Sequence, residues 1–196
     1  MSDMHRNPRV PDSDVDPAFV DRWSPRAFSP DPIPAHQLAA LFEAARWAPS
    51  CYNEQPWLFL YATTEEDRQA FASALVEKNR AWAARAPLLI FLATRKRFGS
   101  NNRPNRHAGF DAGAAWMSLA LQARKLGLHA HAMAGFDVDR ARTVLKLNED
   151  EYDLMAAIAV GRRVGPDSLP EEYRPQEKPN NRKPAGEIAR PIQAGT

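Results

Sequence analysis

Two short stretches of the chain carry side chains that could bind an anionic or polar ligand. In the first, Arg22 and Arg26 are four residues apart with Ser24 between them, in the order Arg-Trp-Ser-Pro-Arg. If residues 18–24 end a helix, both guanidinium groups reach one side, and such a pair with a hydroxyl suits a phosphate or a flat carbonyl edge. A solvated, charge-rich face is the simpler alternative for this spacing.

The second stretch is residues 46–57, Arg-Trp-Ala-Pro-Ser-Cys-Tyr-Asn-Glu-Gln-Pro-Trp. Pro49 begins a polar loop whose candidate binding side chains are Ser50, Cys51, Asn53 and Gln55. A helix leads into this loop and a strand leaves it, and junctions of this kind favour binding sites. The alternative is that Ser50 and Asn53 only satisfy local hydrogen bonds of a turn.

The elements that must position these residues follow from hydrophobic spacing. Leu38, Leu41, Phe42 and Ala45 recur as one face of a helix that Pro49 ends. Further along the chain the pattern predicts a strand at 57–61, a helix from Thr64 to Lys78, a buried strand at 87–93, a helix at 110–126, a strand at 128–134, a short helix after Asp137 and a buried strand at 154–160. Asn79 is then either a helix-ending turn residue or a ligand contact.

The helix at 110–126 is apolar on nearly all sides and stops at Gly127. Such a helix must be enclosed, so it either crosses the core or lies in a subunit interface. The loop at 94–107 is basic and shows no apolar period. We interpret it as a rim over a pocket, where positive charge would attract an anionic substrate.

Composition indicates one globular domain between two arms. The 196 residues are 44% hydrophobic and 26% charged, with a net charge of +2, too weakly basic to predict a nucleic-acid partner. Residues 1–18 are polar and predicted to be a flexible arm, and the proline-rich residues 166–196 cannot form a globular unit alone, so they must wrap another surface.

Cysteine and histidine usage limits the chemistry further. Cys51 is the only cysteine, which excludes an internal disulfide and favours a reducing compartment. His129 and His131 share one side of a strand but are too few for a zinc site, so no metal is expected. Because the chain shows no signal-peptide core and no apolar run long enough to span a bilayer, we expect a cytoplasmic protein without a membrane partner.

Several motifs in order resemble the FMN-dependent nitroreductase family, particularly its compact members. They are Arg22-Trp-Ser-Pro-Arg26, Ala45-Arg-Trp-Ala-Pro-Ser-Cys-Tyr-Asn-Glu-Gln-Pro-Trp57, Asn79 with Ala86-Pro87, Asp111-Ala-Gly-Ala-Ala115, Leu126-Gly-Leu128, Ala134-Gly-Phe-Asp137 and Arg182-Lys183-Pro184. The resemblance implies an α+β fold with a mainly antiparallel sheet of four to five strands flanked by helices. It also implies an intertwined homodimer, with residues 19–165 as the FMN-binding domain and residues 166–196 as an arm that wraps the partner subunit.

The resemblance assigns roles to the first stretch. Arg22 matches the arginine that meets the FMN phosphate, and Ser24 matches the small polar residue beside it, with Trp23 between them in the cofactor-binding motif. Arg26 matches a basic residue at the N1 and C2-carbonyl edge of the ring, where it would act as an electrostatic stabiliser. Asn79 matches an asparagine that binds the pyrimidine or ribityl oxygens.

The second stretch matches a loop that the opposite subunit offers to the flavin. Pro49, Ser50, Cys51 and Asn53 belong to that loop, and Gln55 lies at its exit. Cys51 stands where serine or threonine is more usual, so a thiol would lie near the isoalloxazine, and the sequence does not say whether it has a chemical role.

Three further positions complete the implied flavin site. Ala134 and Gly135 match a strand end whose backbone N–H points at flavin N5, and Arg182 matches a late basic residue at the phosphate. Ala134 replaces a glutamate of some members, and Trp82 replaces a lysine at the pyrimidine edge of the flavin, which leaves Arg26 with more of that charge.

The implied activity is an NAD(P)H-dependent oxidoreductase working by ping-pong, with nitroaromatic, quinone or similar small molecules as electron acceptors. Flavin chemistry needs no protein nucleophile or general base, and no catalytic side chain of that kind is predicted. The alternatives are a flavoprotein of the same fold with another reaction (dehalogenation, dehydrogenation or flavin breakdown) and a non-catalytic FMN-binding protein. The sequence decides neither the physiological acceptor nor NADH against NADPH.

Overall fold

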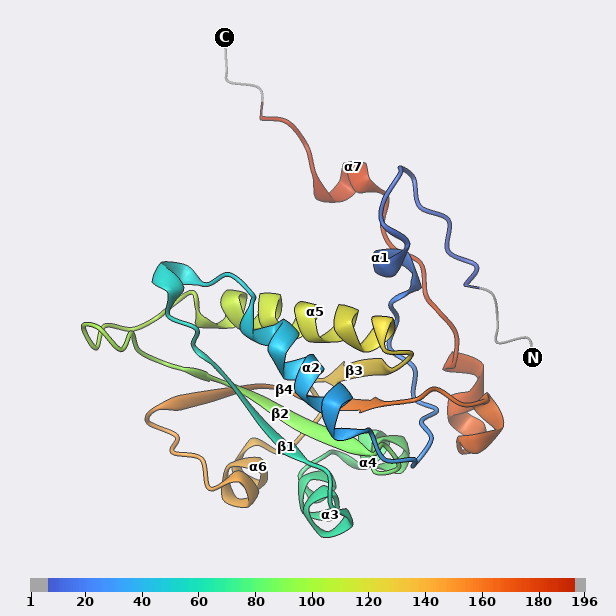
Figure 1. The fold of residues 1–196 in the computed structure, drawn as a ribbon, viewed down its shortest axis with the longest axis horizontal. Coiled ribbons are helices and arrows are strands. Elements are labelled where there is room, and N and C mark those ends of the chain that lie inside the picture. Colours follow the sequence, from blue (N-terminus) through green and yellow to red (C-terminus); the bar gives the residue numbers. More distant parts are fainter. Residues whose placement is uncertain (1–6, 193–196) are drawn as a thin grey trace.

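The computed structural model describes residues 7–192 (Figure 1). Its strands are β1 (Trp57–Ala62), β2 (Leu88–Arg95), β3 (His129–Met133) and β4 (Tyr152–Gly161). Its helices are α1 (Pro17–Asp21), α2 (Ala35–Arg46), α3 (Glu65–Ser73), α4 (Glu77–Ala83), α5 (Ala108–Lys125), α6 (Val138–Leu145) and α7 (Ala185–Ile188), with 3-10 turns η1 (Cys51–Asn53), η2 (Pro166–Ser168) and η3 (Glu171–Gln176). The predicted α+β fold is confirmed.

The four strands form one antiparallel sheet in the order β1-β2-β4-β3. The central strand β2 alternates between two cores, because Leu88, Ile90 and Leu92 face one layer and Leu89 and Phe91 face the other. This two-sided burial explains the unbroken apolar run that identified the strand in the sequence.

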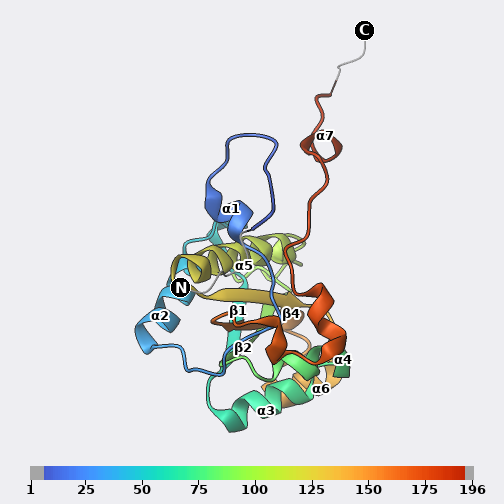
Figure 2. The ribbon, with the colours of Figure 1, turned by 90° about the vertical axis from the view of Figure 1, so that its right-hand side faces the viewer.

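Helices cover both faces of the sheet (Figures 1 and 2). On one face α2 and α5 pack against the strands, with Leu41 and Leu119 fully buried between the layers. On the other face lie α3, α4 and α6, and the core there includes Leu75 and Trp82. None of the helices in the described part of the chain is long and apolar enough to cross a membrane.

The predicted helix from Thr64 to Lys78 is wrong in its second half. Thr64 does cap α3, and its side chain accepts the Asp67 N–H, but α3 ends at Ser73 and α4 begins at Glu77. Between them Leu75 forms a bridge with Phe136 after the end of β3. Pairing with a distant segment therefore interrupts a pattern that is continuous in the sequence.

Helix α5 carries the predicted stop, since Gly127 adopts the left-handed φ of 73° that glycine accepts most easily. Only one side of α5 is buried within the chain. Phe110 is 83% exposed, Gly113 is exposed and Met117 is half-buried. An interface on this side remains a prediction.

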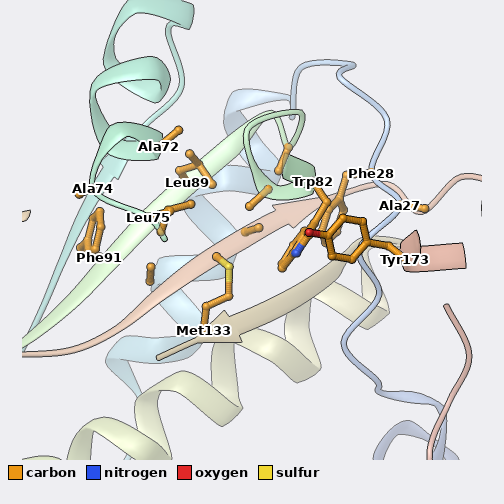
Figure 3. Packing of buried hydrophobic residues seen from close by; sticks show 14 of the residues in the cluster. Ala27, Phe28, Ala72, Ala74, Leu75, Trp82, Leu89, Phe91, Met133 and Tyr173 are labelled. Carbon is orange, nitrogen blue, oxygen red and sulfur yellow. The ribbon is translucent and has the colours of Figure 1, made fainter. Parts of the chain in front are cut away.

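The segment after β4 packs partly on the chain itself. Leu169 and Tyr173 are buried, and Figure 3 shows Tyr173 beside Trp82 and Phe28 in the core. Beyond Glu177 the chain leaves the body and continues past α7 as an extended arm (Figures 1 and 2). Residues 166–177 thus contribute to the folded body, and wrapping of a partner by the rest is still a prediction.

Candidate active site

A cavity of about 440 Å³ lies between residues 22–26, β3 and the C-terminal segment. The predicted site residues Trp23, Ser24, Arg26 and Arg182 line it together with His131. Trp23 is buried and fixes the backbone, whereas Ser24 and Arg26 are half-buried and Arg182 is exposed. The fold thus brings residues from both ends of the chain to one cavity.

A cluster of arginines stands beside this cavity. Arg22 points Nη1 at Ser24 Oγ, 3.5 Å away, and with Arg9 and Arg182 it also borders a second cavity of about 680 Å³. Burial, and after it the charge of Arg182, lowers the pKa of Arg22. Among the described residues no carboxylate lies within 4.0 Å of these three guanidinium groups. Two half-buried arginines and one exposed arginine, without a nearby carboxylate among the described residues, favour an anionic ligand.

An aromatic stack supports the inner wall. The His131 ring lies 4.6 Å from the Trp82 ring, and the Arg26 guanidinium lies 5.9 Å from the same indole. His131 Nδ1 is 2.8 Å from the Pro25 carbonyl oxygen, so Nδ1 carries the proton and Nε2 is an acceptor. Burial lowers the pKa of His131 to about 4, although the bond to Pro25 opposes the change. The ring is neutral near pH 7.

The other histidine of β3 has a structural setting. His129 is buried, packs edge-on against Trp23 at 6.2 Å, and has its pKa lowered to about 3 by burial and then by Arg124 and Arg163. Within residues 7–192 no three His, Cys, Asp or Glu side chains gather as metal ligands would.

Asn79 lies in the first turn of α4, so its interpretation as a helix-ending residue is wrong. Its Nδ2 donates to the Gly135 carbonyl at 2.9 Å, and the Val76 N–H donates to the same oxygen at 3.2 Å. A Cβ on Gly135 would lie 2.6 Å from Asn79 Nδ2 and 2.9 Å from Val76 Cγ2, so a larger residue would displace these side chains. Ala134 is exposed at the adjoining end of β3. The contact fixes the strand end and α4 against each other.

The loop after α2 is strained. Tyr52, Asn53 and Gln55 have φ values of 52°, 56° and 49°, in the left-handed region. Each such residue costs about 1 kcal/mol relative to ordinary backbone. Tyr52 is also 91% exposed. Strain of this kind persists where surrounding structure enforces it, and it is frequent at functional sites.

Two contacts hold the loop in place. Ser50 Oγ accepts the Gln55 N–H at 2.9 Å, and the Cys51 N–H donates to Asp111 Oδ2 at 3.1 Å. Asp111 is only 3% exposed and lies near the start of α5, while Pro49 is exposed at the beginning of the loop. Ser50 therefore makes the local turn bond, and the buried carboxylate ties the loop to the core.

The structure does not bring the two stretches together within one chain. The loop is attached at Asp111, near the start of α5. Helix α1 lies at the opposite end of α5, where burial lowers the pKa of Arg124 and the negative charge of Asp21 opposes the change (Figure 1). At 1.5 Å per residue these two points of α5 are about 20 Å apart. Each chain thus carries two separated parts of the predicted site.

Three residues at the site were not predicted. Arg9 donates to the Val20 and Arg22 carbonyl oxygens at 3.1 and 2.8 Å. Glu177 accepts the backbone N–H groups of two residues in the 22–28 segment. Neither has a local signal, because each lies in a segment without hydrophobic period. His131 was visible only as a member of a histidine pair.

Comparisons with known proteins agree with this architecture. The sequence model described as Nitroreductase family matches residues 20–81 and 74–162. A Streptomyces coelicolor protein, provisionally named NADH dehydrogenase/NAD(P)H nitroreductase, is 29% identical over 178 residues, covering 81% of this chain and 88% of the relative.

Solved structures extend the likeness over the whole chain. A crystal structure described as an oxidoreductase containing FMN has a TM-score of 0.91 at 38% identity and covers 98% of both chains. An enone reductase of gut-bacterial fatty acid saturation has a TM-score of 0.73 at 21% identity, covering 94% of this chain and 100% of its own. At that identity the second likeness shows the fold alone.

Proposed function

Because the chain belongs to the nitroreductase family, we propose that it is an FMN-dependent oxidoreductase that takes hydride from NADH or NADPH. It passes the electrons by ping-pong to nitroaromatic, quinone or similar small acceptors. The observation that carries this proposal is the cluster of Arg9, Arg22 and Arg182, which has no carboxylate within 4.0 Å among residues 7–192. All three arginines line the 680 Å³ cavity, and Arg182 also lines the 440 Å³ cavity.

The cluster fits the phosphate of FMN. Arg22 and Arg182 would bind the dianion, with Ser24 as a hydroxyl partner. Burial, and after it repulsion from Arg182, lowers the pKa of Arg22 in the protein alone, so a bound anion would relieve a cost that is already present. Arginine matches phosphate oxygens in pairs of hydrogen bonds, which gives orientation as well as affinity.

The rest of the cavity fits a polar chain and a flat ring. The Nε2 atom of His131, which lines the cavity, is an acceptor suited to a hydroxyl. Asn79, Ala134 and Gly135 do not line the cavity but lie beyond it, at the C-terminal end of β3. FMN would supply the exchange of hydride and electrons between the nicotinamide and the acceptor. Arg26 would then stabilise the negative charge of the reduced ring without any protein nucleophile.

We place the second half of each site on a partner subunit. Residues 49–55 are tied to Asp111, about 20 Å along α5 from Arg124, which is near the end of α1 just before Arg22. The loop is nevertheless strained and held by a buried carboxylate. In a homodimer, each of two sites would combine the phosphate half of one subunit with the loop of the other. Ser50, Cys51 and Asn53 would then face the partner's flavin. The exposed side of α5 around Phe110 and Met117 is available for that contact.

The test of the function begins with the colour of the purified protein. We expect bound FMN, released on denaturation and matched by its absorption spectrum and mass. Oxidation of NADH and NADPH should then depend on an added quinone or nitroarene, with parallel double-reciprocal lines. Protein that is colourless and does not bind added FMN would refute the proposal, and bound FMN without NAD(P)H oxidation would favour a non-catalytic flavoprotein.

The shared site is tested by mixing two defective variants. Arg22→Met damages the phosphate half and Asn53→Ala damages the loop half. If each site uses both subunits, a heterodimer of the two variants contains one site with both defects and one intact site, so activity should return on mixing. A monomer in sedimentation, or no recovery after verified subunit exchange, would contradict the arrangement.

A further inference from the structure

The backbone around Arg26 is held by side chains from distant parts of the chain. Glu177 Oε2 accepts the Arg26 N–H at 2.8 Å, and Oε1 accepts the Ala27 N–H at 3.2 Å. On the other side of Arg26, the Pro25 carbonyl meets His131 Nδ1 at 2.8 Å. Three successive backbone groups are thus satisfied by a tail carboxylate and a strand imidazole.

Glu177 is unusual for a carboxylate in a proline-rich tail. Its side chain is 0% exposed, and the nearest cation is Arg163, whose Nε lies 4.0 Å from Oε1. Burying a carboxylate is costly unless hydrogen bonds compensate for lost water. The two backbone N–H groups supply that compensation, so the carboxylate and the Arg26 segment depend on each other.

Backbone pairing between residues 27–29 and 162–164 does not bind the Arg26 N–H. This pairing begins one residue later, where the Val164 N–H donates to the Ala27 carbonyl at 3.0 Å and Phe28 pairs with Arg163. The Arg26 N–H lies outside it. The position of Arg26 relative to the cavity therefore depends on Glu177, while its guanidinium is free to lie over Trp82.

We propose that Glu177 is a positioning residue that holds Arg26 in place to stabilise the reduced flavin, with His131 fixing the preceding carbonyl. The inference rests on the proposed function, because the charge that Arg26 meets is that of the reduced cofactor. It also links the site to the tail, since Glu177 is the last buried residue before the chain extends into the arm.

The direction in which the reduction potential of bound FMN shifts separates positioning from a direct effect of charge. In Glu177→Gln, one carboxylate oxygen becomes an NH₂ group, which cannot accept the second N–H. If Glu177 positions Arg26, this change weakens binding of reduced FMN relative to oxidised FMN. If Glu177 acts only through its negative charge, neutralising it should strengthen binding of the anionic reduced form instead.

The experiment is a dye-equilibration titration of the two-electron potential on the FMN-loaded protein. We expect a shift of about −30 mV in Glu177→Gln, equivalent to a tenfold loss of relative affinity for reduced FMN. Glu171→Gln, an exposed carboxylate on η3, is the matched control and should leave the potential unchanged. In an Arg26→Ala background the shift caused by Glu177→Gln should vanish, because its target is gone.

A second arm needs no flavin and keeps the two proposals distinguishable. Hydrogen exchange of the Arg26 and Ala27 amides should be at least tenfold faster in Glu177→Gln than in the wild-type protein, with Glu171→Gln unchanged. Wild-type protein that never binds FMN would refute the proposed function. The exchange rates would then still show whether Glu177 holds the Arg26 and Ala27 amides. A positive shift in potential, an equal shift in the Arg26→Ala background, or unprotected wild-type amides would overturn the positioning role.

Discussion

Replacing Arg22 tests the phosphate site most directly, because the affinity for FMN should fall while the free energy of unfolding of the flavin-free protein should not. Arg22→Met keeps the length of the side chain and its packing but removes the guanidinium charge. Burial and repulsion from Arg182 lower the pKa of Arg22, which means that the folded protein without ligand disfavours this charge. The free energy of unfolding of the flavin-free protein should therefore stay the same or rise.

Binding of FMN should weaken in the same variant. A hydrogen bond to a charged partner contributes about 1.5–3 kcal/mol, which corresponds to an affinity loss of about 10- to 150-fold. Arg182 and Ser24 remain, so binding should be reduced rather than lost. The backbone of Arg22 still accepts the Arg9 donor at 2.8 Å, so the local fold is preserved.

The assay compares FMN with riboflavin, which has the same ring and ribityl chain but no phosphate. Titration by flavin fluorescence should show the loss for FMN and little change for riboflavin, and Arg85→Ala, an exposed arginine, should affect neither. An equal loss for both flavins would move Arg22 away from the phosphate. Unchanged FMN affinity would remove Arg22 from the site, and a large fall in the stability of the flavin-free protein would show that the side chain is structural.

Three further predictions concern the parts that hold the site together. Asp111→Ala should lower the free energy of unfolding by about 1–3 kcal/mol in urea titrations, because the Cys51 N–H at 3.1 Å loses its acceptor; Asp111→Asn keeps an acceptor oxygen and should lose less. Gly135→Ala should cost about 1–3 kcal/mol, since its Cβ would lie 2.6 Å from Asn79 Nδ2, and an unchanged melting temperature would show that the two elements move apart easily. Burial lowers the pKa values of the two β3 histidines to about 3 and about 4, so below the unfolded pKa of about 6.5 the unfolded chain binds more protons and stability should fall as the pH drops from about 6.5 towards 4; His131→Gln should flatten that slope, and an identical slope would refute this origin.

Local pattern was sufficient for most of the elements. The apolar spacing of Leu38, Leu41, Phe42 and Ala45 identified α2, and the continuous apolar run identified β2. These predictions succeeded because burial on one helix face, or on both faces of a strand, imposes a period of a few residues that the sequence displays. The prediction that the helix from Thr64 continues to Lys78 is wrong from residue 74 onward, because the pairing of Leu75 with Phe136 overrides local helix preference.

The candidate site divides in the same way. Residue types and spacing, with the family resemblance, singled out Arg22, Ser24 and Arg26 and the loop from Ser50 to Gln55 from the sequence alone. No spacing rule could show that the two groups lie at opposite ends of α5 in one chain. That separation follows from the docking of α5 and α1, and it is the reason for placing the second half of the site on a partner.

The sequence by itself determined the family, the order of helices and strands, and the polar residues available for binding. The family resemblance already implied that Arg22 and Arg182 meet at one phosphate. Only the tertiary structure showed that Arg9 joins them and that Glu177 is buried against the backbone of Arg26. The physical reason is that periodicity records the burial of neighbours along the chain. A contact across 151 positions depends on how all the layers pack and leaves no local trace.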